Sequence, residues 1–569
     1  MSRRAFVLAL VLLTMPIAFL LTVTLAQLVV TDTRFASLRR EQSQAFYLAQ
    51  TALNLGYQSL AASNFARATL QPDGLTAVAG PGVLSVDYPG LEFQDGWCVW
   101  RWNPGDPSAA NFAGDGQAEE FRLSVHFPSP GRWTIRSQGR HGAWTSEQIQ
   151  TGQLEGLFEY AIFDAQDLSE FVRGADQTVN GKVHANGDLY FRPTGSTLTI
   201  LSNSVTCAGR MVRYRDAWNR PDSGGTVRIS SGSSAGSLVT MEGKSQGWTG
   251  QGKAFDSYHS AWTSGARSRW QGVVRDASLG GSARTPLAVQ SLEPGGYYDE
   301  HAGLRIGPST PEEGTWLKRK TFYNQAEGRQ VTVHEVDLEA MVAAGRFPAN
   351  GLLYASTPIR LAKAQLLPAG LTVACNSTLY VQGDFNQVYP NQTAYSSGTS
   401  QKKPAALITR DRIYHLTTGF SDTASYNGSI PAGSEPSRFA GDPSHRLEVN
   451  AALVDGAPTV DERNWRQDYA GQTNPYYNPV HVSGQNAWAN SDDFLEGLGS
   501  ITVRKRGSIV HLQNATMAPF DNSGSQTPWI VKTHYGAPVR DYGYDPDLST
   551  NPPPFTPLVS RKVLWQQRR

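Results

Sequence analysis

The chain opens on a long apolar run. No charged residue occurs from position 5 to position 31, and the run is rich in Leu, Val, Ala and Phe. A helix from Phe6 to Val30 would be roughly 37 Å long at about 1.5 Å per residue, which is enough to cross a bilayer. Because Arg3 and Arg4 would hold the preceding end in the cytoplasm, the pattern predicts a membrane-spanning segment over residues 1–30, with the remaining chain outside.

A helical pattern continues beyond this run, over residues 31–70. The alternative is a cleaved secretory signal, with Thr24-Leu25-Ala26 as the small-residue cleavage site. The apolar run is longer than is usual in such a signal, and the pattern continues past Ala26, so we expect one long helix that keeps its membrane segment. The residues near one face of the continuation are Phe35, Leu38, Ala45, Ala49, Ala52, Gly56 and Leu60.

Short alternating runs follow a Gly- and Pro-rich break at residues 71–82. Alternation of apolar and polar residues is typical of half-buried strands, and it is clearest from Phe121 to Phe127. We therefore expect an antiparallel meander over residues 80–155. The predicted strands are Val83–Tyr88, Trp97–Trp102, Glu120–Phe127, Trp133–Ser137 and Gly142–Thr151.

From about residue 158 the strands become shorter, and Gly, Asn, Asp and Ser separate them. Strands of three to five residues with tight polar corners favour a β-solenoid over residues 158–520, and a β-sandwich is the alternative. We expect loops near residues 243–268 and 387–403. The predicted strands are Lys182–Ala185, Asp188–Phe191, Leu198–Leu201, Val205–Ala208, Val227–Ser230, Leu238–Met241, Ile359–Leu361, Leu371–Ala374, Leu379–Gln382, Ala405–Thr409, Leu447–Leu453, Ile501–Arg504 and Ser508–Leu512.

Composition agrees with a mainly β protein. The 569 residues include 55 glycines and 33 prolines, and charged residues make up 17%. The net charge of +1 gives no overall attraction to nucleic acid or anionic lipid, so any such binding must come from local patches. Cys98, Cys207 and Cys375 fit no zinc spacing, and we expect three buried thiols rather than a Cys207–Cys375 disulfide.

The N-terminal order of features resembles that of PilX-type minor pilins. A short basic leader with Arg4-Ala5-Phe6 precedes the apolar run, and the segment from Arg39 to Leu53 contains the phrase Ala45-Phe46-Tyr47-Leu48-Ala49. The resemblance covers about the first 55 residues. It implies a type IV pilus-like assembly in which the apolar helices of the subunits pack together. The implied partners are other pilin subunits and the pilus assembly machinery.

Leader cleavage between Ala5 and Phe6 is the processing event that this resemblance implies. Major pilins carry a glutamate five residues after the processed bond, whereas this chain has Leu10 there, and Gln50 stands where PilX-type sequences often have Glu. A missing glutamate suits a minor subunit. The same resemblance implies that residues 80–155 form a pilin-like head and that the Pro- and Tyr-rich segment 521–569 packs back on it.

The remaining chain resembles a domain of unassigned function that is attached to PilX-like starts in Deinococcus–Thermus-type bacteria. The shared phrases lie at residues 179–191, 380–386 and 542–557, and the first two each place Gly-Asp at a corner. That family includes proteins similar to the competence pseudopilin ComZ, in which a β-solenoid is carried on a pilin head. The resemblance implies a role in DNA uptake.

Motifs for catalysis and metal binding are weak. Gly232–Gly236 matches the sequence pattern of a nucleophile elbow. That motif needs a helix after it, whereas we expect a strand there. His184 lies beside Asn186 and Asp188, residues that more often satisfy backbone groups at corners. We expect no enzyme activity and no cofactor, although a polysaccharide-active enzyme on a β-helix is one alternative. The calcium candidates, which lack the EF-hand spacing, are Asp541, Asp545 and Asp547.

Basic residues interleaved with aromatic ones form the better binding signal. Such groups neutralise phosphates and stack on bases when they share a face. The alternative is a solvated face on which arginine stems cover apolar surface. Together with the role in DNA uptake that the resemblance implies, these groups make DNA capture the favoured function, and a surface adhesin for sugar or protein is the alternative. The four groups are Arg210, Arg213, Tyr214, Arg215, Trp218 and Arg220; Arg267, Arg269, Trp270 and Arg275; Lys318, Arg319, Lys320, Phe322 and Tyr323; and Arg504, Lys505 and Arg506.

Overall fold

The chain divides into two compact units, which are described separately. The helix–sheet unit comprises Met1–Leu60, Ala66–Gln153 and Lys562–Arg569, and the parallel-strand unit comprises Ala61–Phe65 and Leu154–Arg561. The computed structural model describes residues 3–65, 91–104, 116–170, 176–191, 193, 196–213, 225–232, 237–241, 255–324, 329–388, 401–420, 422, 446–456, 493–494, 502–512 and 539–568.

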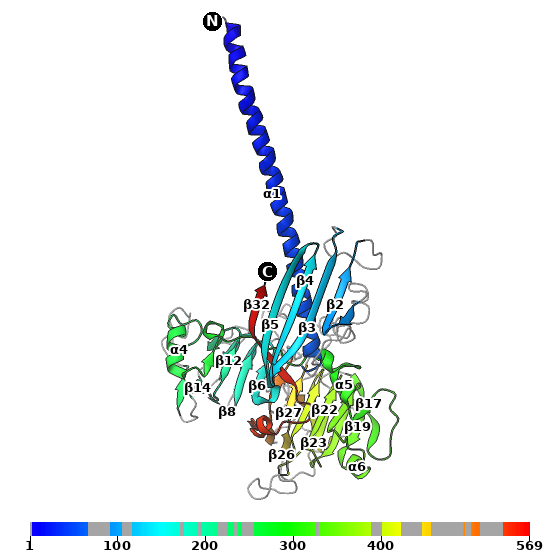
Figure 1. The fold of residues 1–569 in the computed structure, drawn as a ribbon. Coiled ribbons are helices and arrows are strands. Elements are labelled where there is room, and N and C mark those ends of the chain that lie inside the picture. Colours follow the sequence, from blue (N-terminus) through cyan, green and yellow to red (C-terminus); the bar gives the residue numbers. More distant parts are fainter. Residues whose placement is uncertain are drawn as a thin grey trace. The chain divides into compact units, whose positions relative to one another are not determined.

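One continuous helix, α1 (Arg3–Ala62), dominates the helix–sheet unit (Figure 1). The prediction of a single long helix is confirmed. Its first half exposes large apolar side chains, whereas Ala45, Ala49 and Ala52 in the second half are fully buried. The predicted change from an apolar segment to an amphipathic one therefore appears in α1 as a change from exposed to buried apolar side chains.

The second half of α1 packs on a six-stranded antiparallel sheet. The order of the strands is β1-β2-β3-β4-β5-β32, so the last strand of the chain lies beside β5. Predicted strands at Trp97–Trp102 and Trp133–Ser137 are confirmed, and Val83–Tyr88 lies outside the described residues. The bounds are β1 Glu92–Gln94, β2 Trp97–Trp102, β3 Glu119–Ser129, β4 Arg132–His141, β5 Trp144–Gly156 and β32 Leu558–Arg568.

Close contact between α1 and β4 depends on Gly139. A Cβ atom at this position would collide with the carbonyl oxygen of Ala45 and the backbone nitrogen of Ala49. The Gln148 side chain on β5 donates a hydrogen bond of 3.1 Å to the carbonyl of Phe46. The absence of a side chain on β4 thus lets the helix backbone approach the sheet directly.

In the first part of the parallel-strand unit, the chain passes repeatedly through the same three sheets and adds one strand to each sheet in turn. Leu168, Leu189 and Met211 stand opposite one another in three neighbouring parallel strands. At the corners before the first two of these strands an aspartate accepts from the backbone N–H of the next turn: Asp167 accepts from Asp188, and Asp188 from Arg210, at separations of 21 and 22 residues. The strands of the two smaller sheets are β7 Leu168–Glu170, β10 Leu189–Phe191 and β13 Met211–Arg213, and β8 Gln177–Asn180, β11 Thr197–Leu201, β14 Thr226–Ser230 and β15 Leu238–Thr240.

A ten-stranded sheet connects this course to the rest of the unit. All its neighbouring pairs are parallel and nearly all of its residues are buried. The order is β16 (Val274–Arg275), β12 (Val205–Cys207), β9 (Lys182–Ala185), β6 (Tyr160–Asp164), β30 (Ile509–His511), β27 (Ala452–Asp455), β24 (Ala405–Thr409), β22 (Leu371–Cys375), β20 (Leu352–Ala355) and β17 (Leu304–Ile306).

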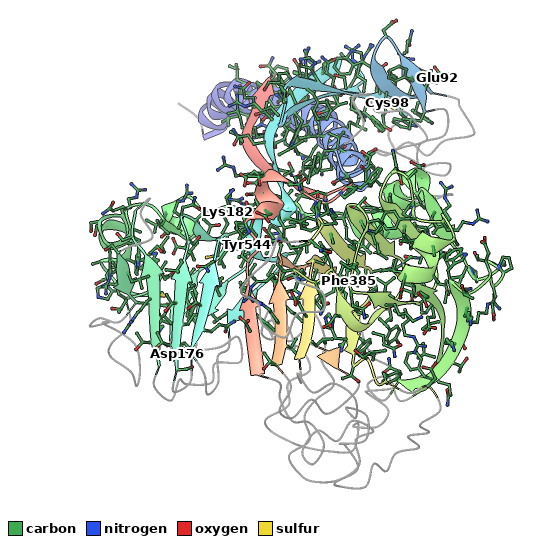
Figure 2. All side chains as sticks on the ribbon, turned by 90° about the horizontal axis from the view of Figure 1, so that it is seen from below. Glu92, Cys98, Asp176, Lys182, Phe385 and Tyr544 are labelled. Atoms are coloured by element: carbon green, nitrogen blue, oxygen red, sulfur yellow. The ribbon has the colours of Figure 1, made fainter. Side chains whose placement is uncertain are left out.

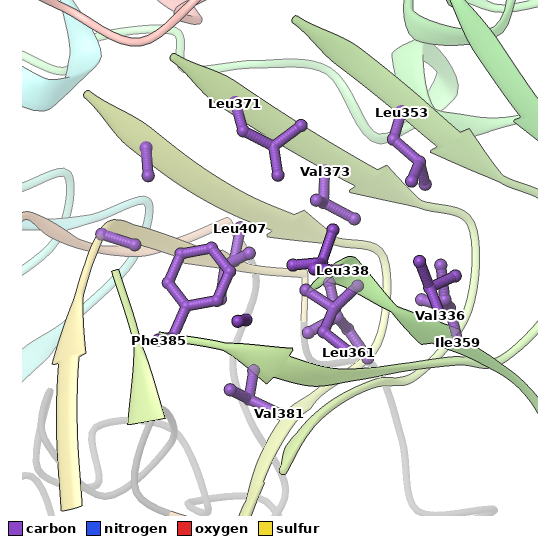
Figure 3. Close-up of a cluster of buried hydrophobic side chains, with 14 of the residues drawn as sticks. Val336, Leu338, Leu353, Ile359, Leu361, Leu371, Val373, Val381, Phe385 and Leu407 are labelled. Carbon is purple, nitrogen blue, oxygen red and sulfur yellow. The ribbon is translucent and has the colours of Figure 1, made fainter. Parts of the chain in front are cut away.

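A nine-stranded sheet packs against this one over an apolar core. Phe385, Leu361 and Val381 from one sheet meet Leu407 and Val373 from the other (Figure 3). The path of the nine-stranded sheet is β18 (Leu317–Asn324), β19 (Arg329–Asp337), β21 (Ile359–Ala364), β23 (Leu379–Phe385), β26 (Arg446–Asn450), β29 (Thr502–Arg506) and β31 (Val539–Gly543), with β25 (Ile413–Leu416) and β28 (Asp493–Phe494) beside it.

Short helices complete the unit. The segment 243–268, predicted as a loop, contains the start of α4, and that part of the prediction is wrong. Three buried residues spaced four apart, Trp262, Ala266 and Trp270, hold this helix on the core despite its Gly and Ser content. The helices are α4 Trp262–Trp270, α5 Tyr297–His301, α6 Leu338–Ala343 and α10 Asp547–Thr550, with 3₁₀ turns η1 Leu157–Glu159, η2 Ala277–Leu279 and η3 Val289–Leu292.

The chain is therefore mainly β, with a long N-terminal apolar helix, as the sequence predicts. The sheets of the described residues are open strand paths, and a closed solenoid column is not found among them. Cys98, Cys207 and Cys375 are buried thiols, which confirms that prediction. The run Leu447–Leu453, read as one strand, is two strands that belong to different sheets.

Candidate functional site

The first half of α1 is the most apolar exposed surface of the described residues. Phe19, Leu28 and Phe35 are 71%, 64% and 58% exposed. Thr24 and Thr31 donate their hydroxyls to the carbonyls four residues earlier, at 2.8 and 2.7 Å, so their polar atoms are satisfied within the helix. Among the described helices, α1 alone is long and apolar enough to cross a membrane.

The predicted processing site lies at the start of this helix. Ala5, Phe6 and Leu10 all have helical backbone within α1. The leader is therefore continuous with the helix rather than a separate segment. Whether the Ala5–Phe6 bond is cut stays a prediction.

The first basic group is divided by burial. Arg210 is exposed and lies over the ring of Tyr258 at 5.1 Å, to which it also donates a 3.1 Å hydrogen bond. Arg213, in contrast, is fully buried and donates to the carbonyls of Phe191 and Gly225. Its guanidinium therefore supports the corner of the fold and is not exposed at the surface. Tyr214, Arg215, Trp218 and Arg220 lie outside the described residues.

The second basic group lies on α4 and β16. Arg267 and Arg275 are exposed, whereas Trp270 is fully buried in the core. The guanidinium of Arg269 lies 5.0 Å from the ring centre of Phe255, so its stem covers apolar surface as the alternative interpretation of these groups expects.

A buried aspartate joins these two groups. The Asp276 carboxylate accepts from the Ser257 hydroxyl at 2.6 Å and from the Trp262 indole N–H at 2.7 Å. Ser257 lies beside Tyr258, and its hydroxyl accepts from the backbone N–H next to Arg210, which belongs to Met211. The exposed cations of both groups, together with the half-buried Arg269, are thus held on one end of the parallel-strand unit. We call this set the α4 basic surface: Arg210, Tyr258, Arg267, Arg269 and Arg275.

The third basic group lies at the opposite end of the unit. Lys318 and Arg319 on β18 are exposed, and Arg319 donates to the carbonyl of Pro308, just after β17. Since β16 and β17 are the two edges of the ten-stranded sheet, nine strand spacings of about 4.8 Å, roughly 43 Å, separate this group from the second. Lys320 on the same strand is half-buried.

The fourth group is engaged internally. Arg506 donates to the Asp541 carboxylate at 2.6 Å, and Arg504 lies 3.4 Å from the same carboxylate. Lys505 is buried, with its ammonium 5.4 Å from the ring centre of Tyr542. These cations stabilise β29 against β31 and do not form an exposed patch.

The three calcium candidates fall into two ion-paired sets. Asp541 pairs with the two arginines of β29. Asp545 and Asp547 both accept from the Lys402 ammonium, at 2.7 and 3.0 Å. An ammonium occupies the position that a shared cation would need. Across the parts of the chain that the structure describes, no three His, Cys, Asp or Glu side chains are arranged to hold a metal ion.

His184 is a structural residue at a corner. It is fully buried on β9, with Nδ1 2.7 Å from the Thr206 hydroxyl and Nε2 3.0 Å from Asn186 Oδ1. Burial lowers the pKa of His184 to about 4. Asn186 also accepts from and donates to the backbone of Arg284, as the corner interpretation predicts. Ser233 to Gly236 of the elbow-like motif lie outside the described residues.

One polar cluster was not predicted from the sequence. Asp164, His511 and Asp455 end three adjacent strands, β6, β30 and β27, and stand opposite one another in register. All three are buried, and His511 Nδ1 lies 3.0 Å from Asp455 Oδ1. Burial raises the pKa of Asp164 to about 7, and the nearby His511 opposes this by less. Each of the three residues follows directly after a short apolar run, and this is the sequence feature by which the cluster could have been found.

Comparisons with known proteins give little support to a family assignment. No protein-family model and no curated protein matches the chain. Among solved structures, the chain is similar to the competence-associated pilin ComZ from Thermus thermophilus, with 12% identity and a TM-score of 0.26 over 93% of this chain and 97% of that one. A TM-score of this size does not establish a common fold, and it does not show the family of the chain.

Proposed function

We propose that this chain is a membrane-anchored minor pilin or pseudopilin of a type IV pilus-like system. The observation that carries the proposal is the division of α1 into an exposed apolar half and a half that packs on an antiparallel sheet. An exposed apolar run of this length is unfavourable in water and favourable in lipid or among similar helices. The partners of α1 are then the membrane and the helices of other pilin subunits.

The membrane anchor is tested by charge substitution on α1. Leu21→Arg with Leu25→Arg should release the protein from membranes, because an arginine at the centre of a span costs about 2.5–3.5 kcal/mol. The measurement is the fraction that sediments with membranes after a carbonate wash. Tyr47→Arg is the matched control, since Tyr47 is 61% exposed on the same helix but lies in its sheet-packed half. Wild-type protein that stays soluble would end the proposal.

We further propose that the parallel-strand unit is a β-solenoid that carries a binding surface outside the membrane, and that double-stranded DNA is its ligand. The α4 basic surface supports this proposal, because it gathers three exposed arginines and an exposed tyrosine at one end of the unit, with the half-buried Arg269 among them. The acidic side chains beneath it, Asp256 and Asp276, are buried and accept internal hydrogen bonds. Their charge is thus held away from an approaching phosphate.

Charge reversal tests the DNA proposal. Arg210→Glu with Arg267→Glu and Arg275→Glu should weaken DNA binding at least tenfold at moderate salt and reduce the slope of log K against log salt by about 2 to 3. Gel shifts over a salt series measure both quantities. The matched control is Lys318→Glu with Arg319→Glu at the other end of the unit. Equal losses for the two sets would mean that binding is not localised to the α4 basic surface.

A further inference from the structure

The six-stranded sheet has two open edges among the described strands. β1 lies at one edge and β32 at the other. Both carry exposed apolar side chains: Phe93 on β1 is 40% exposed, and Val563, Leu564 and Trp565 on β32 are 57%, 47% and 47% exposed. Edge strands with exposed apolar residues readily pair with another strand unless they are blocked.

The two edges carry opposite charge. The segment 91–96 around β1 contains Glu92 and Asp95 and no basic residue, and Glu92 marks this edge in Figure 2. The segment 562–569 at the other edge contains Lys562, Arg568 and Arg569 and no acidic residue. Each edge is therefore complementary to the other in charge as well as in apolar character.

Side-chain direction fixes which residues could face one another. Phe93 pairs with Cys98, and successive cross-strand partners lead through Leu123 and Ser137 to Gln148, whose side chain bonds α1. Cross-strand partners share a face of a sheet, so Phe93 is on the helix-covered face.

Leu564 on the opposite edge is on that same face. The Lys562 ammonium lies 4.4 Å from the ring centre of Tyr57 on α1, and alternate residues of a strand share a face. Placing Phe93 opposite Leu564 in an antiparallel pair therefore brings Lys562 level with Asp95, the first residue of the tight turn that follows β1. That register joins an apolar pair on the helix-covered face with an acidic turn residue that lies level with a basic strand residue.

Strand direction allows this pairing between copies without turning either one over. Neighbouring strands from β1 to β5 are antiparallel. β32 runs antiparallel to β5, since Leu157 N bonds Pro557 O while Gln150 Nε2, earlier on β5, bonds Leu564 O, later on β32. Six alternating strands leave β1 and β32 pointing in opposite directions. Two copies related by translation, with both α1 helices pointing the same way, thus present β32 and β1 to each other as antiparallel partners.

We propose that β32 of one copy pairs with β1 of a second copy, so that the sheets of neighbouring subunits join edge to edge. This inference rests on the proposed function, because a shared membrane gives the copies a common helix direction. The contact is heterologous, and it leaves one free edge at each end to add further copies. Extension by a strand is a recurrent mode of protein recognition.

Cysteine cross-linking between differently tagged copies tests the pairing. Phe93→Cys in one copy and Leu564→Cys in the other should form a disulfide-linked dimer that carries both tags, because directly opposite Cβ atoms lie about 4.5–5.5 Å apart. Each variant alone should give no such dimer. Cys98 lies directly opposite position 93 in the β1–β2 pair, so every copy in this experiment also carries Cys98→Ala. Cys207 and Cys375 are buried, and burial raises the pKa of Cys375 to about 12, so these two thiols do not compete. Phe93→Cys with Leu238→Cys, exposed on β15, controls for random collision.

Charge exchange provides the second arm. Asp95→Lys should lower the cross-linking yield about three- to fivefold, and Lys562→Glu in the other copy should restore it. Leu564→Cys that cross-links to itself would overturn the heterologous arrangement. Cross-linked dimers are measured in the membrane fraction. If the protein is in this fraction but forms no cross-linked dimer, the edge pairing is wrong and the membrane anchor stands. If the protein is absent from this fraction, both the edge pairing and the membrane anchor are wrong.

Discussion

Replacing Asp164 by asparagine should stabilise the protein at pH 8 and leave its stability unchanged near pH 4. Asp164 is buried among parallel strands beside His511, with Asp455 next along the row and Asp167 nearby. Burial raises the pKa of Asp164 from its ordinary value of 3.8 to about 7. The folded protein therefore holds this proton at pH values where the unfolded chain has released it.

The sign of the effect follows from proton binding. Below about pH 4 the carboxyl is protonated in both states and contributes nothing. As pH rises from 4 to 7 the unfolded chain ionises while the folded state does not, so folding loses about 1.4 kcal/mol per pH unit, up to about 4 kcal/mol above pH 7. Asparagine keeps an oxygen that can accept the 2.8 Å hydrogen bond from the Gln166 backbone and cannot ionise, so it removes this loss.

Denaturant unfolding of the full chain in detergent, from pH 4 to pH 8, measures the difference. Asp455→Asn is the matched control in the same row, and it should not reproduce the gain in stability at pH 8, because Asp455 Oδ1 already has a partner 3.0 Å away in His511 Nδ1. If Asp164→Asn is instead more harmful at pH 8 than at pH 4, the carboxylate is ionised and paired in the folded protein.

The local pattern of the sequence predicts elements better than it predicts their partners. Trp97–Trp102 and Ala405–Thr409 are strands with the predicted bounds, because each is a compact apolar run between polar turns. No local signal indicates that Ala405 lies beside Leu371 in a parallel pair. The spacing of 21 and 22 residues between successive turns could not be recognised in the sequence, because long segments separate the later strands.

The candidate site shows the same limit. Arg210 and Arg213 are equivalent in the sequence, yet one is exposed beside Tyr258 and the other is buried against backbone carbonyls. The spacing of charges along the chain identifies basic residues but does not show which end of a sheet they occupy. The third and fourth basic groups, around Lys318 and Arg504, could therefore be separated from the α4 basic surface only once the strand order was known. The row of Asp164, His511 and Asp455 joins residues almost 350 positions apart, and only strand register brings them together.

Gly139→Leu should detach α1 from the sheet and destabilise the helix–sheet unit by about 3 kcal/mol or more. Insertion of extra carbons into a filled core typically costs 1–3 kcal/mol, and the upper end applies because the atoms in the way are helix backbone, which cannot change rotamer. Gly139→Ala should already be harmful, since a Cβ alone meets Ala45, Leu48 and Ala49.

Two measurements separate detachment from general damage. Thermal unfolding of the full chain in detergent should show an early transition for Gly139→Leu, and limited proteolysis should cut near Phe46 on the released helix. Gly307→Ala is the control glycine substitution, because its Cβ would make only ordinary contacts, the nearest at 3.4 Å to Ser356. A Gly139→Leu protein that resists protease like the wild type would show that α1 does not depend on this approach to β4. The membrane anchor should survive in the variant, since the apolar half of α1 lies far along the helix from residue 45 and keeps its own affinity for lipid.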